Sequence, residues 1–115
     1  MSHKGRKRKE ARRQARAVVF AALGDETRLL LVARLSAGEP RSIAELTEGS
    51  SLTRQAITKH LRVLERAGVV RCERAGRESR FAFDPRPLNE LHEYLDRVSR
   101  RWDEALGRLK ALVED

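Results

Sequence analysis

The stretch SIAELTEGSSLTRQAITKHLRVLERAGVV, residues 42–70, decides the fold of this chain. It predicts two short helices joined by a glycine-containing turn of about three to four residues, a length typical of a helix-turn-helix. Ser42 and Glu45 have the spacing of a capping box, which starts the first helix. Thr53 is the predicted N-cap of the second helix, which runs over residues 54–67 and is closed by glycine.

The second helix has one apolar and one polar face. Ala56, Ile57, Leu61 and Leu64 keep helical spacing, so the opposite face is expected to meet solvent. Reading a DNA sequence needs hydrogen-bond donors and acceptors at the exposed start of such a helix, where Gln pairs with adenine and Arg or Lys with guanine. The alternative is an ordinary solvated face and, for the histidine, a partly buried or capping role. The predicted DNA contacts of this helix are Thr53, Arg54, Gln55, Thr58, Lys59, His60 and Arg62.

A β-hairpin wing is predicted over residues 69–84, because the hydrophobic period changes there from helical to alternating. Gly76 allows a tight turn, and Arg77 beside it is placed to enter a narrow minor groove. Cys72 is expected to pack on the inner face of the hairpin, since redox sensing would require exposure and a lowered thiol pKa. The predicted DNA contacts of the wing are Arg74, Arg77 and Arg80, the last with Glu78 or Glu73 as alternative partners.

Two helices are predicted ahead of this region. The first begins near Ala11 and the second runs over residues 26–37, where Leu29, Leu30, Leu31 and Leu35 are expected to form the central core. Residues 1–10 are predicted to be a disordered basic tail, because they offer too little apolar surface to offset the cost of ordering. Residues 11–115 are then expected to be one domain.

The last helix is predicted over residues 85–113, with apolar residues at alternating spacings of three and four along its whole length. Such a helix is roughly 40 Å long, whereas a globule of this chain length has a radius of gyration of about 13 Å. One small domain hardly covers that apolar stripe, so a second subunit is expected. The predicted dimer interface comprises Val18, Val19, Leu91, Leu95, Val98, Trp102 and Leu109.

Charge points to a polyanionic partner. The formal net charge is +8, and residues 1–16 alone hold eight lysine or arginine residues against Glu10. This tail is interpreted either as a DNA-binding arm or as a solubilising extension. Cys72 stands alone, which suits a reducing compartment, and neither a membrane span nor a signal peptide is predicted. The expected location is the cytoplasm, at the nucleoid.

Catalytic and metal-binding patterns are missing from the sequence. It has no Ser/His/Asp set, no glycine-rich phosphate loop and no Cys–His pairing, so an enzyme is not predicted. His92 with Asp96 could be half of a metal site, but a structural metal needs about four ligands. We therefore predict no metal and no cofactor, and leave open a small-molecule pocket between the long helices.

The order of these elements resembles the ArsR-like family of bacterial winged helix-turn-helix transcriptional regulators. The segments that carry the resemblance are ALGDETR at 22–28, IAEL at 43–46, QAITKHLRVL at 55–64, AGVV at 67–70, and Gly76-Arg77 before Phe81. The resemblance implies a mainly α fold with a small β-hairpin, a homodimer built from the first and last helices, and repression from an inverted-repeat operator. Metal-sensing members have a Cys-x-Cys motif where this chain has Ser42-Ile43-Ala44-Glu45-Leu46, so the inducing signal stays open.

The predicted function is that of a sequence-specific DNA-binding repressor whose partners are double-stranded DNA and a second copy of the chain. Two alternatives remain at this point. One is a dimeric protein-interaction module, which the basic recognition helix disfavours. The other is a non-specific DNA binder driven by the tail, which deletion of residues 1–16 would reveal.

Overall fold

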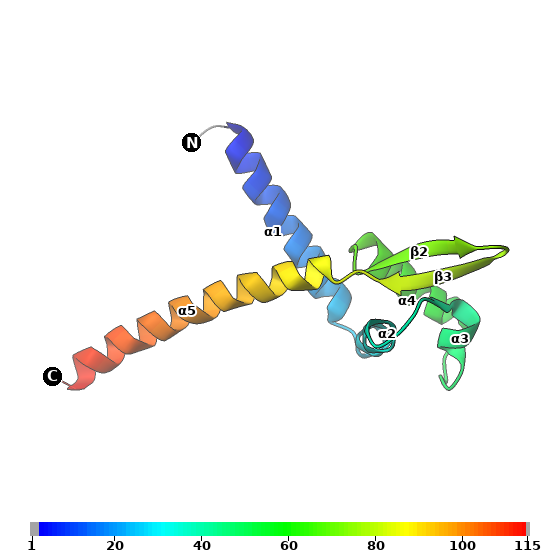
Figure 1. The fold of residues 1–115 in the computed structure, drawn as a ribbon. Helices are drawn as coiled ribbons and strands as arrows, with labels where there is room; N and C mark the ends of the chain where they lie inside the picture. The colour runs from blue at the N-terminus through cyan, green and yellow to red at the C-terminus, as the bar shows by residue number, and fades with distance from the viewer. Residues whose placement is uncertain (1–2, 115) are drawn as a thin grey trace.

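The chain forms a mainly helical body with a small antiparallel sheet (Figure 1). The computed structural model describes residues 3–114, so the part of the predicted tail at residues 1–2 lies outside the described residues. The elements, in chain order, are α1 (His3–Leu23), α2 (Glu26–Ser36), β1 (Arg41–Ser42), α3 (Ile43–Thr47), α4 (Arg54–Arg66), β2 (Val70–Ala75), β3 (Glu78–Phe83) and α5 (Arg86–Glu114).

The helix-turn-helix and its caps are confirmed. The Ser42 hydroxyl accepts a hydrogen bond from the Glu45 amide, and the Glu45 carboxylate accepts one from the Ser42 amide, each at 3.1 Å. At the end of α4 the amide of Gly68, whose φ is 79°, donates to the Glu65 carbonyl, and the Val69 amide donates to the Leu64 carbonyl. This is a Schellman motif, in which glycine adopts the left-handed backbone without a Cβ penalty.

The wing is a three-stranded sheet in the order β1-β3-β2. The predicted hairpin is confirmed, with Val70 opposite Phe83 and Ala75 opposite Glu78. Sequence analysis missed β1, in which Arg41 pairs with Phe81 on β3. Two residues are too few to show an alternating pattern. The pairing nevertheless ties the start of α3 to the wing, so the helix-turn-helix and the hairpin form one unit.

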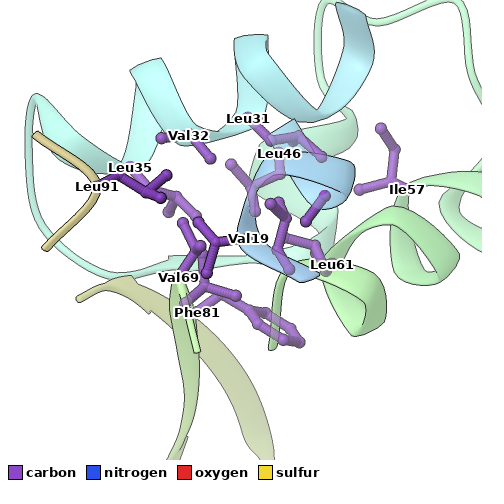
Figure 2. Close-up of a cluster of buried hydrophobic side chains, with 13 residues drawn as sticks. Val19, Leu31, Val32, Leu35, Leu46, Ile57, Leu61, Val69, Phe81 and Leu91 are labelled. Atoms are coloured by element: carbon purple, nitrogen blue, oxygen red, sulfur yellow. The ribbon is translucent and has the colours of Figure 1, made fainter. Parts of the chain in front are cut away.

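A single apolar core lies where α1, α2, α4 and the base of the wing meet, and Figure 2 shows its side chains converging from these elements. Leu61, Leu64, Val69 and Phe81 are completely buried. The predicted core of α2 is partly wrong. Leu31 and Leu35 are buried, but Leu29 and Leu30 remain 51% and 61% exposed, since an amphipathic helix turns only part of its circumference toward the core.

The N-terminal helix starts earlier than predicted. α1 begins at His3 rather than near Ala11, so residues 3–10 are helical and the predicted disorder is corrected there. Six of residues 3–10 are lysine, arginine or glutamate, which are good helix formers, and the segment contains no proline. The prediction weighed only apolar burial, which residues 3–10 lack, and overlooked this local helix propensity.

The last helix extends far beyond the core. Leu91 is the only α5 residue among those described that is buried, and α5 leaves the body on the side opposite the β2–β3 hairpin (Figure 1). The resulting chain measures 67 Å along its longest axis and has a radius of gyration of 19.0 Å, well above the ~13 Å expected for a compact globule of this length. The α5 apolar stripe is therefore uncovered within one chain.

The predicted interface residues fall into two groups. Val19 and Leu91 are each 5% exposed and belong to the core, because α1 and α5 cross there. Their apolar surface is already covered within the chain, which favours a core role over the predicted interface role. The others are exposed or half-buried at the surface, namely Val18, Leu95, Val98, Trp102 and Leu109.

The Cys72 side chain is exposed, not packed inside the hairpin as predicted. It lies opposite Phe81 in the sheet, but it belongs to the edge strand β2, whereas Phe81 belongs to the central strand β3. Val70, two residues earlier on β2, is buried, so the cover that the core gives to this strand ends before Cys72.

Asp84 anchors the junction between the wing and α5. Its carboxylate accepts hydrogen bonds from the Arg86 amide and Nε at 3.0 Å and from Arg86 Nη2 at 2.6 Å. These bonds favour the ionised form and lower the pKa of Asp84 to about 2, with the Arg86 side chain as the largest cause. The Arg86 pKa is raised for the same reason.

Truncation of the core should be costly. We expect Leu61→Ala to lower the free energy of unfolding by about 2–5 kcal/mol, because Leu61 is fully buried and a cavity would remain. Leu30→Ala, at a 61% exposed leucine, is the matched control. Urea unfolding at one fixed protein concentration measures both. Equal losses in the two variants would contradict the assignment of Leu61 to the core.

Acid should weaken the Asp84 anchor. Because the folded pKa of about 2 lies below the ordinary value of 3.8, the stabilisation is present above about pH 4 and is lost as the pH falls toward 2. We expect Asp84→Asn to lower Tm at pH 7 and to show a smaller further loss of Tm between pH 4 and 2 than wild type. Asp103→Asn, at an exposed residue of α5, serves as control. An unchanged acid profile for Asp84→Asn would refute this account.

Candidate nucleic-acid interface

The exposed face of α4 results from the burial of its opposite face. Ile57, Leu61 and Leu64 are at most 2% exposed and hold α4 against the core. Since successive residues turn by about 100° around a helix, the polar residues of the first two turns point outward. They form one stripe, here called the α4 stripe, which consists of Arg54, Gln55, Thr58, Lys59 and Arg62.

Two threonines at this end of α4 use their hydroxyls locally. Thr53 Oγ1 accepts a hydrogen bond from the Ala56 amide at 3.1 Å, as an N-cap does. Thr58 Oγ1 donates to the Arg54 carbonyl at 2.7 Å. The Thr53 hydroxyl therefore orders the first turn of the helix, and the Thr58 hydroxyl proton is already engaged within the helix.

His60 faces away from the α4 stripe. Its Nδ1 lies 3.2 Å from Arg28 Nη1 and 3.7 Å from Asp25 Oδ2, at the junction of α1 and α2. Arg28 also donates from Nε to the Ala22 carbonyl at 2.6 Å. His60 therefore ties α4 to the α1–α2 junction, which favours the partly buried alternative over its predicted DNA contact.

The Asp25 carboxylate completes this junction. It caps α2 by accepting a hydrogen bond from the Arg28 amide at 3.0 Å. That bond is the largest cause of the lowered pKa of Asp25, and the nearby charge of Arg28 adds to it. Sequence analysis missed the tertiary role of Arg28, which no local pattern could reveal because its partners lie on α1 and α4.

Arg62 is shared between α4 and the wing. Its Nη1 donates to Glu65 Oε1 at 2.7 Å, and its guanidinium lies 5.5 Å from the centre of the Phe81 ring. The bond to Glu65 is the largest cause of its raised pKa. Arg62 is thus more constrained than Arg54 or Lys59, and a phosphate would compete with Glu65 for it.

The wing carries its arginines toward the hairpin tip. Gly76 has φ of 65°, whereas Arg77 does not have a positive φ, as in a type II′ turn, so Arg77 occupies the tip as predicted. Arg80 pairs with Glu78 at 3.4 Å, which was one of its predicted alternatives. Within residues 3–114, the interface arginines and lysine that make no ion pair are Arg54, Lys59, Arg74 and Arg77.

A further arginine positions the helix-turn-helix. Arg34 on α2 donates to the Leu46 carbonyl at 2.9 Å and to the Glu45 carbonyl at 3.2 Å, at the end of α3. It satisfies carbonyls that a short helix leaves without partners. Sequence analysis did not single it out; an arginine near the end of a leucine-rich helix was the available signal.

The geometry suits a polyanion. Unpaired cations on the α4 stripe and the hairpin tip flank a helix face with amide and hydroxyl groups, and such a set neutralises phosphates and bonds to base edges.

Among residues 3–114, no three His, Cys, Asp or Glu side chains come together where they could hold a metal ion. His92 and Asp96 stand 3.9 Å apart as an exposed pair. No described helix is long and apolar enough to cross a membrane.

Comparisons with known proteins all match the chain to helix-turn-helix proteins. A family described as a helix-turn-helix domain matches residues 23–73. The chain is 43% identical over 79 residues to the uncharacterized HTH-type transcriptional regulator YuzN of Bacillus subtilis, covering 64% of this chain and 86% of that protein. It is 37% identical over 96 residues to the HTH-type transcriptional regulator Rv2034 of Mycobacterium tuberculosis, covering 83% of this chain and 85% of that protein.

Among solved structures, an ArsR-like transcriptional regulator from Rhodococcus sp. RHA1 superimposes with a TM-score of 0.81 at 36% identity. The match covers 88% of this chain and 92% of that one. It therefore extends well beyond the helix-turn-helix.

Proposed function

The chain belongs to the ArsR-like family of winged helix-turn-helix transcriptional regulators, and we propose that it represses a promoter by binding an inverted-repeat operator as a homodimer. Proteins of this family regulate transcription and are not enzymes. The observation that carries the proposal is the α4 stripe, a solvent-facing row of amide, hydroxyl and cationic groups held outward by a fully buried opposite face.

Base reading is assigned to the start of the α4 stripe. Gln55 presents a donor and an acceptor that match the major-groove edge of adenine, and Arg54 and Lys59 present donors that match guanine. Thr58 contributes a methyl group that suits the thymine methyl. Thr53 contributes through the first-turn geometry that its hydroxyl caps. His60 is left out, because it binds Arg28 behind the helix.

Phosphate contacts are assigned to residues around this centre. Arg77 at the hairpin tip is suited to a narrow minor groove, where the negative potential is strongest. Arg62 and Arg80 each have an acidic partner within 3.4 Å that a phosphate would displace. Arg74 has no such partner among the described residues. Together these cations supply sequence-independent affinity that falls with salt.

Uncovered apolar surface supports the proposed homodimer. Leu95, Trp102 and Leu109 are 48%, 64% and 56% exposed along one side of α5, and Val18 on α1 is 49% exposed. Exposure of so many large apolar side chains on a projecting helix is typical of an interface. A twofold pairing of α5 with a second copy would cover the stripe and place the two α4 helices on half-sites about one DNA turn, ~34 Å, apart.

Sequence-specific binding predicts a selective loss in α4 variants. With DNA from the promoter just upstream of the gene for this protein, we expect Gln55→Ala to weaken binding about 5- to 150-fold, since one good base contact contributes ~1–3 kcal/mol of discrimination. Binding to a scrambled duplex of equal length should stay unchanged. Fluorescence anisotropy at one salt concentration measures both.

Arg54→Ala is a second test variant for this experiment, and Arg100→Ala is the matched control. Arg54→Ala should behave like Gln55→Ala but also lose some affinity for the scrambled duplex, because it removes a charge. Arg100, on the exposed surface of α5, should change neither affinity by much. If Gln55→Ala weakens the two duplexes equally, or neither, the assignment of base reading to the α4 stripe is wrong.

Dimerisation through α5 predicts dissociation when charge enters the stripe. We expect Trp102→Glu to shift the protein from dimer to monomer in analytical ultracentrifugation and to abolish specific DNA binding, because two carboxylates would face each other in an apolar interface. Arg108→Glu, on the same helix but off the stripe, is the control. A Trp102→Glu variant that stays dimeric with normal DNA binding would exclude this interface.

A further inference from the structure

The first part of α1 is a helix of concentrated positive charge. Residues 3–16, here called the basic arm, contain eight lysine or arginine residues and one acidic residue, Glu10, out of a whole-chain charge of +8. Residues 6–15 are all exposed. The arm leaves the body away from the β2–β3 hairpin (Figure 1), so it is spatially separate from the wing.

The arm opposes its own helical structure electrostatically. Arg8 has like-charged neighbours at i−4 and i+4, Lys4 and Arg12, and like charges at this spacing destabilise a helix. Its first turn carries no acidic residue, although the positive end of the helix dipole lies there. A bound polyanion would relieve both repulsions, so the arm gains helical stability from such a partner.

The arm has no apolar face. Its only apolar side chains are those of Ala11 and Ala15. A helix that lies in a membrane surface needs an apolar half, and a helix that docks in a protein groove needs apolar anchors. Neither partner fits residues 3–16. Regularly spaced phosphates do, because their recognition requires charge and reach rather than shape.

The arm is continuous with the core. α1 runs without a break from His3 to Leu23, and its later residues Val19 and Ala22 are buried. The direction of the arm is therefore coupled to that of α4, which packs on the same core. The arm is therefore joined to the body by continuous helix and not by a loop.

We propose that the basic arm is a second, sequence-independent binding surface for the phosphates of duplex DNA, separate from α4 and the wing. The inference rests on the proposed function for the choice of DNA among polyanions. It assigns a role to a net charge of +7 that the proposed base reading by α4 does not use.

The test removes three arm charges in the full chain and keeps the helix. Arg8→Gln/Arg12→Gln/Arg13→Gln replaces exposed arginines by a residue of similar helix propensity. The matched control, Arg97→Gln/Arg100→Gln/Arg108→Gln, removes the same charge from exposed positions of α5. Affinity for a scrambled duplex is measured over a salt series, and sedimentation gives the oligomeric state of both variants.

We expect the arm variant to reduce the slope of log K against log salt by up to about 2.7, since each lost phosphate contact contributes ~0.9. The α5 control should leave that slope nearly unchanged. Equal slope changes in the two variants would mean that only net charge matters and would overturn the proposal. So would an unchanged slope in the arm variant, whether or not its oligomeric state changes.

Failure of the proposed function gives a different result. In that case wild type would bind the promoter and the scrambled duplex alike, whatever the arm contributes. If the arm proposal alone fails, wild type would still prefer the promoter while the arm variant keeps the wild-type salt slope. The promoter-to-scrambled ratio and the difference in slope between the variants therefore separate the two.

Discussion

The buried face of α4 is the constraint on which the rest of the molecule depends. Leu61 and Leu64 have no exposed surface, and Ile57 has almost none. Rotating α4 to present another face would bring charged groups into the core, at a cost far above that of any single surface contact. The same packing that stabilises the domain therefore aims Gln55 and Arg54 outward. Arg28, Arg34 and Asp84 then hold α4, α3 and α5 to that core through hydrogen bonds between elements and at their junctions.

The chain concentrates its tertiary contacts at one end and leaves two long helices only partly packed. α5 contributes a single buried residue, Leu91, and then runs outward with its apolar stripe exposed, while α1 runs outward with a net charge of +7. The chemistry of the two surfaces differs. Apolar side chains such as Trp102 are covered best by another apolar surface, whereas exposed arginines remain solvated until a polyanion replaces water and counterions. One chain thus presents an apolar surface on α5 and a separate cationic surface on α1.

Local sequence patterns predicted the helix caps and turns well, and the burial of individual side chains less well. The capping box, the glycine that ends α4 and the hairpin turn at Gly76 were predictable because each depends on residues close in sequence. The exposure of Cys72 was not, since it depends on where along β2 the cover of the core ends, and Val70 on the same strand is buried. The helix at residues 3–10 was missed because apolar content was weighed and helix propensity was not.

By itself the sequence determined the order of helices and strands, the polar face of α4 and the apolar stripe of α5, because periodicity and capping are properties of neighbouring residues. Only the tertiary structure decided which side chains of each pattern stay exposed and which are buried or bound to another residue of the chain. It turned His60 toward Arg28 and Asp25, engaged Arg62 with Glu65, and buried Val19 and Leu91 in the core. The physical reason is that a side chain's availability depends on groups brought near it by folding, and the partners of His60 lie more than thirty residues away along the chain.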